Sequence, residues 1–211
     1  MNSNRIVFFL LFFFTGLVIL SAQEEGLYGS EAPEDKAFIR VINTSGNSIS
    51  NLAIGALIFK GLSPEELTAY RPLSPGIYII RTGGQQTDLT CSANEYYTIQ
   101  LSSSGPKIFS DVRQEDYLRS QLVLYNLSEL QTVSLKTRDG NTTVINSVGA
   151  GASSQITVNP IDAELSLFSK GEKVSDMKMV DLESGQSYSI FILGKADKNV
   201  ILIKQAEVKI D

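Results

Sequence analysis

Hydrophobic and polar residues alternate along most of this chain in short runs, and Gly, Pro, Ser and Asn separate one run from the next. The runs are rich in Val, Ile, Thr, Tyr and Phe, which suit the pleated, half-buried surface of a strand. In the first half of the chain this pattern predicts strands at 37–43, 52–59, 77–82, 87–91 and 96–101. Short strands bounded by turn residues indicate an all-β fold.

The second half of the chain repeats the plan. Asp139-Gly140 is a strong hairpin signal, and Arg81-Thr82-Gly83-Gly84 predicts a hairpin turn in the first half. The strands predicted in the second half lie at 121–126, 133–136, 143–146, 155–158, 163–168, 174–179, 187–193 and 200–206.

The two halves match each other in detail. The opening strand of each half ends in Asn, at Asn43 and at Asn126, and residues 91–99 align without a gap with residues 182–190. The shared skeleton is an apolar residue, a turn, Tyr, a hydroxyl residue and Ile, which is typical of a tight turn leading into a core strand. Within the adjacent pair Tyr96 and Tyr97, one ring is expected inside and the other outside. We therefore predict two tandem β-sandwich domains, at 23–105 and 120–211.

Residues 106–119 are predicted to connect the two domains. The stretch follows a Ser-Ser-Ser-Gly-Pro segment and is rich in charged residues, which is typical of a connector. One or two helical turns at 111–119 are also compatible with its sequence.

The N-terminus has the layout of a signal peptide over residues 1–22. Arg5 precedes the apolar run 6–20, and Ser21-Ala22 offers a small-residue cleavage site. The alternative is an uncleaved anchor, but the run is short for a membrane span. We expect an exported protein. The net charge is −5 and no basic cluster is present, which argues against binding to nucleic acid.

Candidate chemistry is sparse in this sequence. The chain has no His, so a Ser-His-Asp or Cys-His relay is impossible. The one cysteine, Cys91, lies in a predicted strand and is interpreted as a small buried hydrophobe. Two acidic pairs, Asp162/Glu164 and Asp181/Glu183, each share a strand face, but they are interpreted as solvated strand edges rather than a glycosidase pair. We predict no enzyme activity, no cofactor and no metal site.

Several stretches of this sequence resemble the alginate biosynthesis protein AlgF family. The similarity covers nearly the whole mature chain in order and spacing, and it is carried by Leu27-Tyr28-Gly29, Ala32-Pro33, Phe38-Ile39-Arg40-Val41-Ile42-Asn43, Tyr96-Tyr97-Thr98, Leu124-Tyr125-Asn126-Leu127-Ser128, Leu135-Lys136-Thr137-Arg138-Asp139-Gly140, Asn159-Pro160, Leu165-Ser166-Leu167-Phe168 and Leu182-Glu183-Ser184-Gly185. The chain departs from the family pattern at Ser30-Glu31 and in its neutral connector.

The resemblance implies a periplasmic role in O-acetylation of an exopolysaccharide, alginate or an alginate-like polymer. The implied partners are a membrane-bound O-acyltransferase and periplasmic acetyltransferases, with the polysaccharide itself as a further candidate. The protein would then act as a non-catalytic adaptor between them. The alternative from the residues alone is a secreted carbohydrate-binding or cell-surface structural module, in which Tyr side chains would form the sugar platforms. A hydrolase is a third and more remote reading.

Two short segments are candidates for partner binding. The first is an N-terminal strap formed by Leu27, Tyr28, Gly29, Ala32 and Pro33, whose alternative role is to pack across the first sandwich. The second is formed by Lys173, Val174, Ser175 and Asp176, whose alternative role is a hairpin turn between strands.

Overall fold

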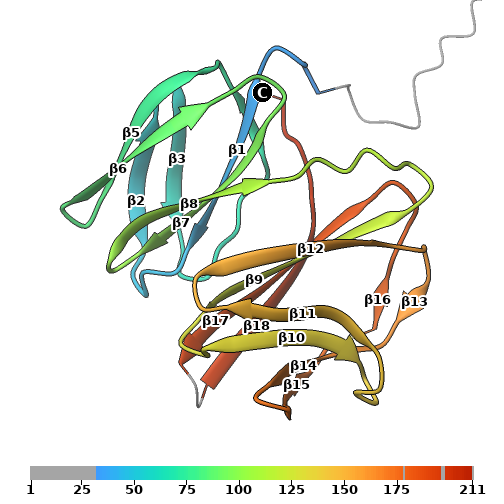
Figure 1. Cartoon of the computed structure of the whole chain (residues 1–211). Helices are drawn as coiled ribbons and strands as arrows, with labels where there is room; N and C mark the ends of the chain where they lie inside the picture. The colour runs from blue at the N-terminus through green and yellow to red at the C-terminus, as the bar shows by residue number, and fades with distance from the viewer. Residues whose placement is uncertain (1–31, 178, 196–197, 211) are drawn as a thin grey trace, which may run out of the picture. The chain divides into compact units, whose positions relative to one another are not determined.

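The computed structural model describes residues 32–177, 179–195 and 198–210 (Figure 1). The chain divides into Met1–Glu31, which lies outside the described residues, and the compact unit Ala32–Asp211. No helix occurs in the described residues, and strands make up most of them. The predicted all-β fold is confirmed, with two tandem β-sandwich domains. The predicted signal peptide and Leu27, Tyr28 and Gly29 lie outside the described residues.

The first domain packs a four-stranded sheet, in the order β4-β1-β7-β8, over two hairpins, β2-β3 and β5-β6. Its core lies between them and includes Ile39 and Val41 from the sheet and Ile54, Phe59 and Leu89 from the hairpins. Its strands are β1 (Ala37–Asn43), β2 (Ile49–Ile54), β3 (Leu57–Leu62), β4 (Arg71–Leu73), β5 (Gly76–Thr82), β6 (Gln85–Cys91), β7 (Tyr96–Ser102) and β8 (Gly105–Asp111).

The second domain packs the sheet β12-β9-β17-β18 against the sheet β11-β10-β14-β15, and a two-stranded sheet, β13-β16, adjoins them. A second core fills the space between the two large sheets. The strands are β9 (Ser120–Ser128), β10 (Thr132–Thr137), β11 (Thr143–Gly149), β12 (Ala152–Val158), β13 (Asp162–Ala163), β14 (Leu165–Ser169), β15 (Glu172–Asp176), β16 (Val180–Asp181), β17 (Ser187–Lys195) and β18 (Lys198–Gln205).

The two domains share one strand register. In each, the opening strand pairs in parallel with a late strand: β1 with β7, and β9 with β17. Arg40 lies opposite Thr98 in the first pair, and Val123 lies opposite Ser189 in the second. These positions correspond in the internal alignment, so the duplication inferred from the sequence extends to the pairing of the sheets.

Several details of the predicted elements are wrong. The strands β4 and β8 were not predicted, and the strand predicted at 163–168 is interrupted at Glu164, between β13 and β14. The single strand predicted at 52–59 is two strands, because the chain reverses at Gly55, whose φ of +57° is readily adopted only by glycine. The predicted connector does not begin at residue 106, since β8 pairs with β7 along its whole length up to Asp111. Only residues 112–119 lie between the sheets of the two domains, and they contain no helix.

Both faces of the strands β1 and β9 are buried. One face of each strand points into its own domain core, and the other lies against the neighbouring domain. A third apolar cluster joins Ile42 and Phe109 of the first domain to Val123, Tyr125 and Phe191 of the second. The outer faces of the sheets β4-β1-β7-β8 and β12-β9-β17-β18 therefore form the contact between the domains.

The C-terminal segment, residues 206–210, returns to the first domain (Figure 1). It runs alongside Tyr70: the Tyr70 amide donates to the Glu207 carbonyl over 2.8 Å, and the Lys209 amide donates to the Tyr70 carbonyl over 2.8 Å. The second domain is thus held to the first at both of its ends.

Candidate functional site

The most unusual group in the protein is Arg40, a charged residue in the middle of the otherwise apolar strand β1. Its side chain is 2% exposed. Because strand residues alternate between faces, the neighbours Ile39 and Val41 enter the first core, and Arg40 points to the other face, toward the second domain. A buried charge is tolerated only when other polar groups replace the water it has lost.

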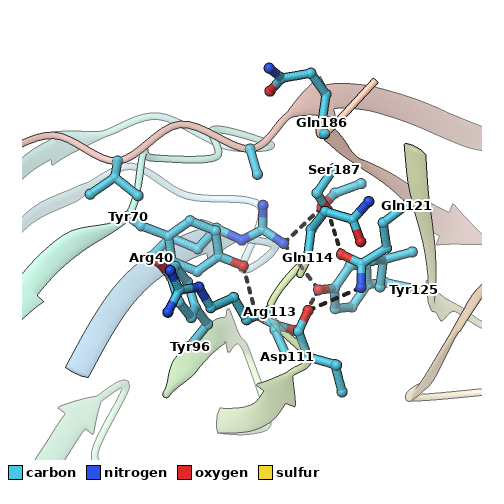
Figure 2. Close-up of a pocket in the computed structure, with 16 residues that line it drawn as sticks. Arg40, Tyr70, Tyr96, Asp111, Arg113, Gln114, Gln121, Tyr125, Gln186 and Ser187 are labelled. Carbon is cyan, nitrogen blue, oxygen red and sulfur yellow. Dashed lines mark hydrogen bonds between the residues drawn. The ribbon is translucent and has the colours of Figure 1, made fainter. Parts of the chain in front are cut away.

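Hydroxyl groups from both domains replace that water. Arg40 Nε donates to Thr98 Oγ1 over 2.8 Å on the neighbouring strand β7. Arg40 Nη2 donates to Tyr125 Oη over 3.0 Å and to Ser189 Oγ over 2.9 Å, on the strands β9 and β17 of the second domain (Figure 2). One guanidinium therefore ties together three strands from two domains.

Asp111, at the end of β8, supplies the opposite charge. Its carboxylate accepts hydrogen bonds from Tyr70 over 2.8 Å, from Thr98 over 2.5 Å and from Tyr125 over 2.5 Å. Thr98 and Tyr125 each accept a hydrogen bond from Arg40 and donate one to Asp111. These two hydroxyl groups bridge the buried charges, and we refer to the set Arg40, Tyr70, Thr98, Asp111, Tyr125 and Ser189 as the Arg40 network.

Their surroundings shift the pKa values of Arg40 and of the two tyrosines in the network. Burial opposes the charged form of Arg40, but its interactions with Tyr70, Tyr125 and Asp111 outweigh burial and raise the pKa of the guanidinium. Burial is also the main reason why the pKa values of Tyr70 and Tyr125 are raised. The guanidinium therefore stays charged and both phenols stay neutral donors near neutral pH.

Aromatic rings enclose the guanidinium. Its carbon lies 4.4 Å from the centroid of the Tyr70 ring, 5.3 Å from that of Phe191 and 5.7 Å from that of Tyr125. The rings of Tyr125 and Phe191 stack with their centroids 4.3 Å apart. A cation over aromatic faces gains most when it is desolvated, and Arg40 is almost fully buried.

A cavity of about 160 Å³ opens beside this network, and we call it the interdomain cavity (Figure 2). Five members of the network line it: Arg40, Tyr70, Asp111, Tyr125 and Ser189. The other polar and aromatic side chains that line it belong to Tyr96, Arg113, Gln114, Gln121, Gln186 and Ser187. The lining combines charge, amide groups and aromatic rings, which is the chemistry of a binding site for a small polar group.

The hydroxyl groups at the cavity are held by other side chains. Ser189 accepts from Arg40, and Ser187 donates to Gln121 Oε1 over 2.7 Å. A nucleophilic hydroxyl needs an adjacent base to take its proton, and neither a guanidinium nor a carboxamide is such a base. Neither serine hydroxyl is therefore activated as a nucleophile by the side chain that it contacts.

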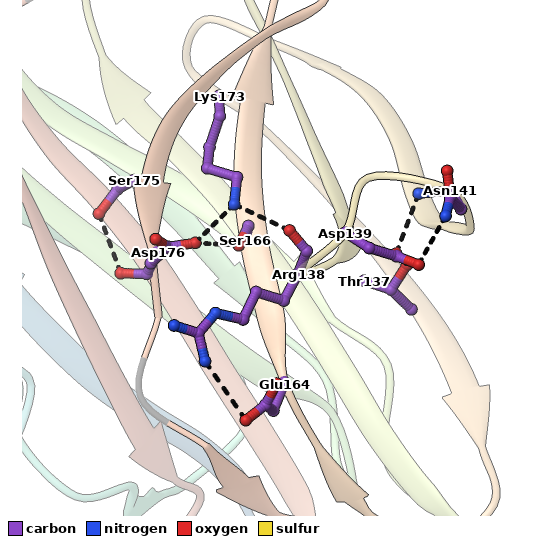
Figure 3. A network of polar contacts seen from close by, with 9 residues as sticks. All are labelled: Thr137, Arg138, Asp139, Asn141, Glu164, Ser166, Lys173, Ser175 and Asp176. Carbon is purple, nitrogen blue, oxygen red and sulfur yellow. Dashed lines mark hydrogen bonds and ion pairs between the residues drawn. The ribbon is translucent and has the colours of Figure 1, made fainter.

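The segment predicted from Lys173, Val174, Ser175 and Asp176 forms the strand β15 rather than a turn. Lys173 Nζ donates to Asp176 Oδ1 over 2.9 Å and to the Arg138 carbonyl over 2.8 Å, and Ser166 Oγ donates to Asp176 Oδ1 over 2.7 Å (Figure 3). The hydrogen bonds from Lys173 and then Ser166 lower the pKa of Asp176. These contacts fix the side chains on the surface of the second domain.

The strand β15 lies at the edge of its sheet, and β18 lies at the edge of the facing sheet. A groove of about 470 Å³ runs between these edges and is lined by Ser175, Asp176, Met177 and the apolar residues Ile201 and Ile203. We call it the edge groove. Unpaired strand edges offer backbone groups to an added strand from another protein.

The predicted N-terminal strap is described only at Ala32 and Pro33. Both are half-buried immediately before β1, and the Pro33 carbonyl accepts a hydrogen bond from the Lys36 amide over 3.2 Å. The structure does not bring them to the interdomain cavity or to the edge groove, whose lining residues do not include them.

Other sequence predictions concern single residues. Cys91 is buried, as predicted, and burial raises the pKa of its thiol to about 11. Tyr97 enters the first core while Tyr96 lies on the opposite face, so the predicted division of this pair is confirmed. Within the described residues, no cluster of three or more His, Cys, Asp or Glu is arranged to hold a metal ion. No helix in the described part of the chain is long and apolar enough to cross a membrane.

Sequence analysis missed Arg40 and Asp111. The signal for Arg40 was present, because a single charge interrupts the apolar run of 37–42. That signal does not identify its partners, which come from strands about 60 to 150 residues further along the chain.

Comparison with known proteins gives a consistent result. Residues 15–189 match the model of the family described as Alginate O-acetyl transferase AlgF. The chain is 32% identical to the alginate biosynthesis protein AlgF of Pseudomonas syringae pv. tomato, over 82% of this chain and 78% of the relative. It is 30% identical to the AlgF protein of Pseudomonas aeruginosa, over 90% of this chain and 88% of the relative.

A solved structure also matches part of the chain. It is the C-terminal domain of AlgF from P. aeruginosa, which is 31% identical over 42% of this chain and 98% of that domain, with a TM-score of 0.39.

Proposed function

The chain belongs to the AlgF family of alginate biosynthesis proteins, and from this premise we propose that it is a non-catalytic adaptor in the O-acetylation of an exopolysaccharide. Alginate or an alginate-like polymer is the proposed substrate of the pathway. The adaptor would link membrane acyl-transfer machinery to periplasmic acetyltransferases. The family description names an acetyltransferase. Under the adaptor proposal, a partner protein carries out the acetyl transfer.

The observation that carries this proposal is the state of the hydroxyl groups at the interdomain cavity. Ser187 and Ser189 are each engaged by a side chain that does not act as a base. The sequence adds that no His is present anywhere in the chain. An acyl transferase that uses a Ser nucleophile needs a group to accept its proton.

The two-domain arrangement supports a tethering role. The apolar contact, the Arg40 network and the C-terminal segment hold the two domains as one body, which can present separate surfaces in a fixed relation. The edge groove is the proposed surface for one partner, with Lys173, Val174, Ser175 and Asp176 at its margin. Holding two proteins together raises the effective concentration of one near the other and increases transfer without new chemistry.

The proposed location is the periplasm. The layout of residues 1–22 as a signal peptide supports export, and a family that acts on a secreted polymer fits the same compartment. Mass spectrometry of the N-terminus of the exported protein tests this directly, since cleavage before Gln23 is expected.

The first test is the acetyl content of the polymer from a strain that lacks this gene, measured by proton NMR. We expect a normal polymer yield with the acetyl signal lost, and restoration by the wild-type gene. Unchanged acetylation would contradict the adaptor proposal. Acetyl transfer by the purified protein alone, from an activated acetyl donor to the polymer, would contradict its non-catalytic part.

A second test places a photo-crosslinking amino acid at Ser175, at the edge groove. We expect cross-links to an acetyltransferase component in intact cells. The matched control carries the same group at Gln86, an exposed residue on the hairpin β5-β6 of the other domain. Equal cross-linking from both positions would remove the edge groove from the proposal.

One observation favours a second candidate, a carbohydrate-binding or cell-surface structural module. The interdomain cavity is lined by Tyr70, Tyr96 and three glutamine side chains, which are groups that bind sugars. Under this alternative, gene deletion leaves acetylation unchanged while the purified protein binds the polymer.

A further inference from the structure

The two domains differ along one side, at the last strand of the sheet that meets the other domain. In the first domain this strand is β8, and the hairpin strand β6 packs against it. Thr87 Oγ1 of β6 donates to the Pro106 carbonyl of β8 over 3.1 Å. At the start of the same two strands, a Cβ added to Gly105 would lie only 2.9 Å from Gln85 Cβ. β6 and β8 thus close this side of the first core.

The corresponding strand of the second domain is β18, which follows β17 as β8 follows β7 and ends its sheet in the same way. The edge groove of about 470 Å³ separates β18 from β15, the edge strand of the facing sheet. Met177, Ile201 and Ile203 line this groove and also pack against the second core. The side that β6 closes in the first domain is therefore open in the second.

The free edge of β18 presents backbone groups of particular residues. The Ala206 amide donates to the Ser187 carbonyl over 2.7 Å, and the pairing of β17 with β18 continues from there without a register shift. Because hydrogen-bonded and non-hydrogen-bonded pairs alternate along antiparallel strands, the even-numbered residues of β18 bond to β17. The N–H and C=O groups of Ile201 and Ile203 therefore point away from β17, to the open edge of the sheet beside the groove.

The middle of β18 lacks the features that protect an exposed edge. Natural edge strands carry charges, proline or bulges, which discourage pairing with another chain. The matched strand β8 contains Pro106 and Lys107, whereas residues 200–203 of β18 are Val-Ile-Leu-Ile. An unprotected edge beside an open apolar groove is suited to receive an added strand.

The charges at the groove indicate which strand fits. Asp176 already accepts hydrogen bonds from Lys173 Nζ over 2.9 Å and from Ser166 Oγ over 2.7 Å (Figure 3). The Lys204 side chain lines the groove, is exposed, and makes no hydrogen bond or ion pair with any residue that the structure describes. An acidic residue on the added strand would complement this charge. The β18 strand of a second copy has no acidic residue to offer.

We propose that the edge groove takes up one extended segment of a partner protein, which adds as a strand to the free edge of β18. The segment carries apolar residues at alternate positions, which cover the groove, and an acidic residue next to Lys204. Main-chain hydrogen bonds to Ile201 and Ile203 provide the affinity, and the groove selects the side chains. This inference rests on the proposed function, since it describes the segment by which a partner would hold the adaptor.

The test is an NMR hydrogen-exchange titration of the mature protein with the peptide Thr-Val-Thr-Val-Thr-Val-Glu, blocked at both ends. At saturating peptide we expect several-fold slower exchange at the amides of Ile201 and Ile203, which gain hydrogen bonds. Val200 and Leu202 already bond to β17, so their exchange should not change. The control peptide has Pro in place of the central Val, lacks an N–H that strand pairing needs, and should protect neither amide.

The variant Lys204→Glu tests the charge at the groove. We expect it to bind the peptide about fivefold more weakly than the wild type, because an exposed ion pair is replaced by two like charges. A peptide that ends in Lys instead of Glu should reverse this preference. The matched control is Lys60→Glu, which makes the same charge change at an exposed position on β3 and should bind like the wild type.

Three results would overturn the inference: no protection of Ile201 and Ile203 by the peptide, equal protection by the proline peptide, or unchanged affinity in Lys204→Glu. Protection of both amides in the protein alone, together with dimers in sedimentation, would assign the edge to a second copy and also overturn it. Absent peptide binding with loss of acetylation in the deletion strain would overturn this inference alone. Peptide binding with unchanged acetylation would instead overturn the adaptor proposal.

Discussion

The two domains share a scaffold and differ on the face where they meet. In both, a buried Asn lies at or near the end of the opening strand. Asn43 Nδ2 donates to the Leu62 carbonyl over 3.0 Å, and Asn126 Nδ2 donates to the Val148 carbonyl over 3.1 Å. On the outer face, however, Arg40 in the first domain corresponds to Val123 in the second. The two copies are therefore alike at this buried Asn. They differ on the outer face of the sheet, which carries a charge in the first domain and an apolar side chain at the corresponding position of the second.

A tyrosine supports the turn before the late strand in each domain. Tyr97 Oη accepts a hydrogen bond from the Ser92 amide over 3.2 Å, and Tyr188 Oη accepts one from the Glu183 amide over 3.1 Å. The same turn contains a residue with positive φ in each copy, +62° at Asn94 and +74° at Gly185. Features that a domain needs for its own folding are therefore the ones that both copies retain.

The largest effect on stability is expected from replacing Arg40, the buried charge that only the first domain has. Arg40→Met removes the buried cation and leaves Asp111 without its opposite charge, which is expected to lower the free energy of unfolding by about 3–5 kcal/mol. Urea denaturation of the mature protein measures this loss. Adding Asp111→Leu should cost less than the sum of the two single changes, because both charges are then gone. Strict additivity of the two changes would show that the two groups are not coupled.

The second-largest effect on stability is expected from replacing the buried Asn that both domains share. Asn43→Ala and Asn126→Ala each leave several buried backbone groups without a hydrogen-bond partner. Each change is therefore expected to lower the free energy of unfolding by about 2–3 kcal/mol. The exposed Asn51→Ala serves as the control and should have little effect. A large cost at one Asn and none at the other would mean that the two scaffolds are not equivalent.

A smaller effect is expected at the two tyrosines. Tyr97→Phe and Tyr188→Phe each remove one acceptor from a backbone amide while preserving the ring in its core. Each should cost about 1 kcal/mol in the free energy of unfolding, by the same urea measurement. Tyr78→Phe removes a hydroxyl that donates to the Ser74 carbonyl at an exposed site and provides the comparison.

The smallest effect concerns the surface of the second domain. The pKa of Asp176 is lowered chiefly by Lys173, so Lys173→Ala should raise that pKa toward its ordinary value. Because the folded-state pKa is depressed, the contribution of Asp176 to stability is present above the unfolded-state pKa and is lost as the pH falls through the folded-state pKa. Carbon-detected NMR titration of the Asp176 carboxyl measures the shift. An unchanged pKa in the variant would assign the depression to Ser166 instead.

The sequence was sufficient for the features that depend on local pattern. Alternation predicted most of the strands but not β4 or β8. Asp139-Gly140 predicted a hairpin that the structure contains between β10 and β11, and the match of residues 91–99 with 182–190 predicted the paired tyrosine turns. The residues of the interdomain cavity could not be predicted in this way. Arg40 and Ser189 are 149 positions apart, and their contact depends on how one sheet packs on another rather than on any local periodicity.

The return of the C-terminal segment to Tyr70 has a consequence for how the protein is made. Synthesis proceeds from the N-terminus, so the first domain is complete before Tyr125, Ser189 and Glu207 exist to cover its outer face. During that interval Arg40 and Asp111 face water, and two charges on an open sheet oppose its association with other nascent chains. The charges on this sheet thus disfavour such association until the second domain and residues 206–210 cover them.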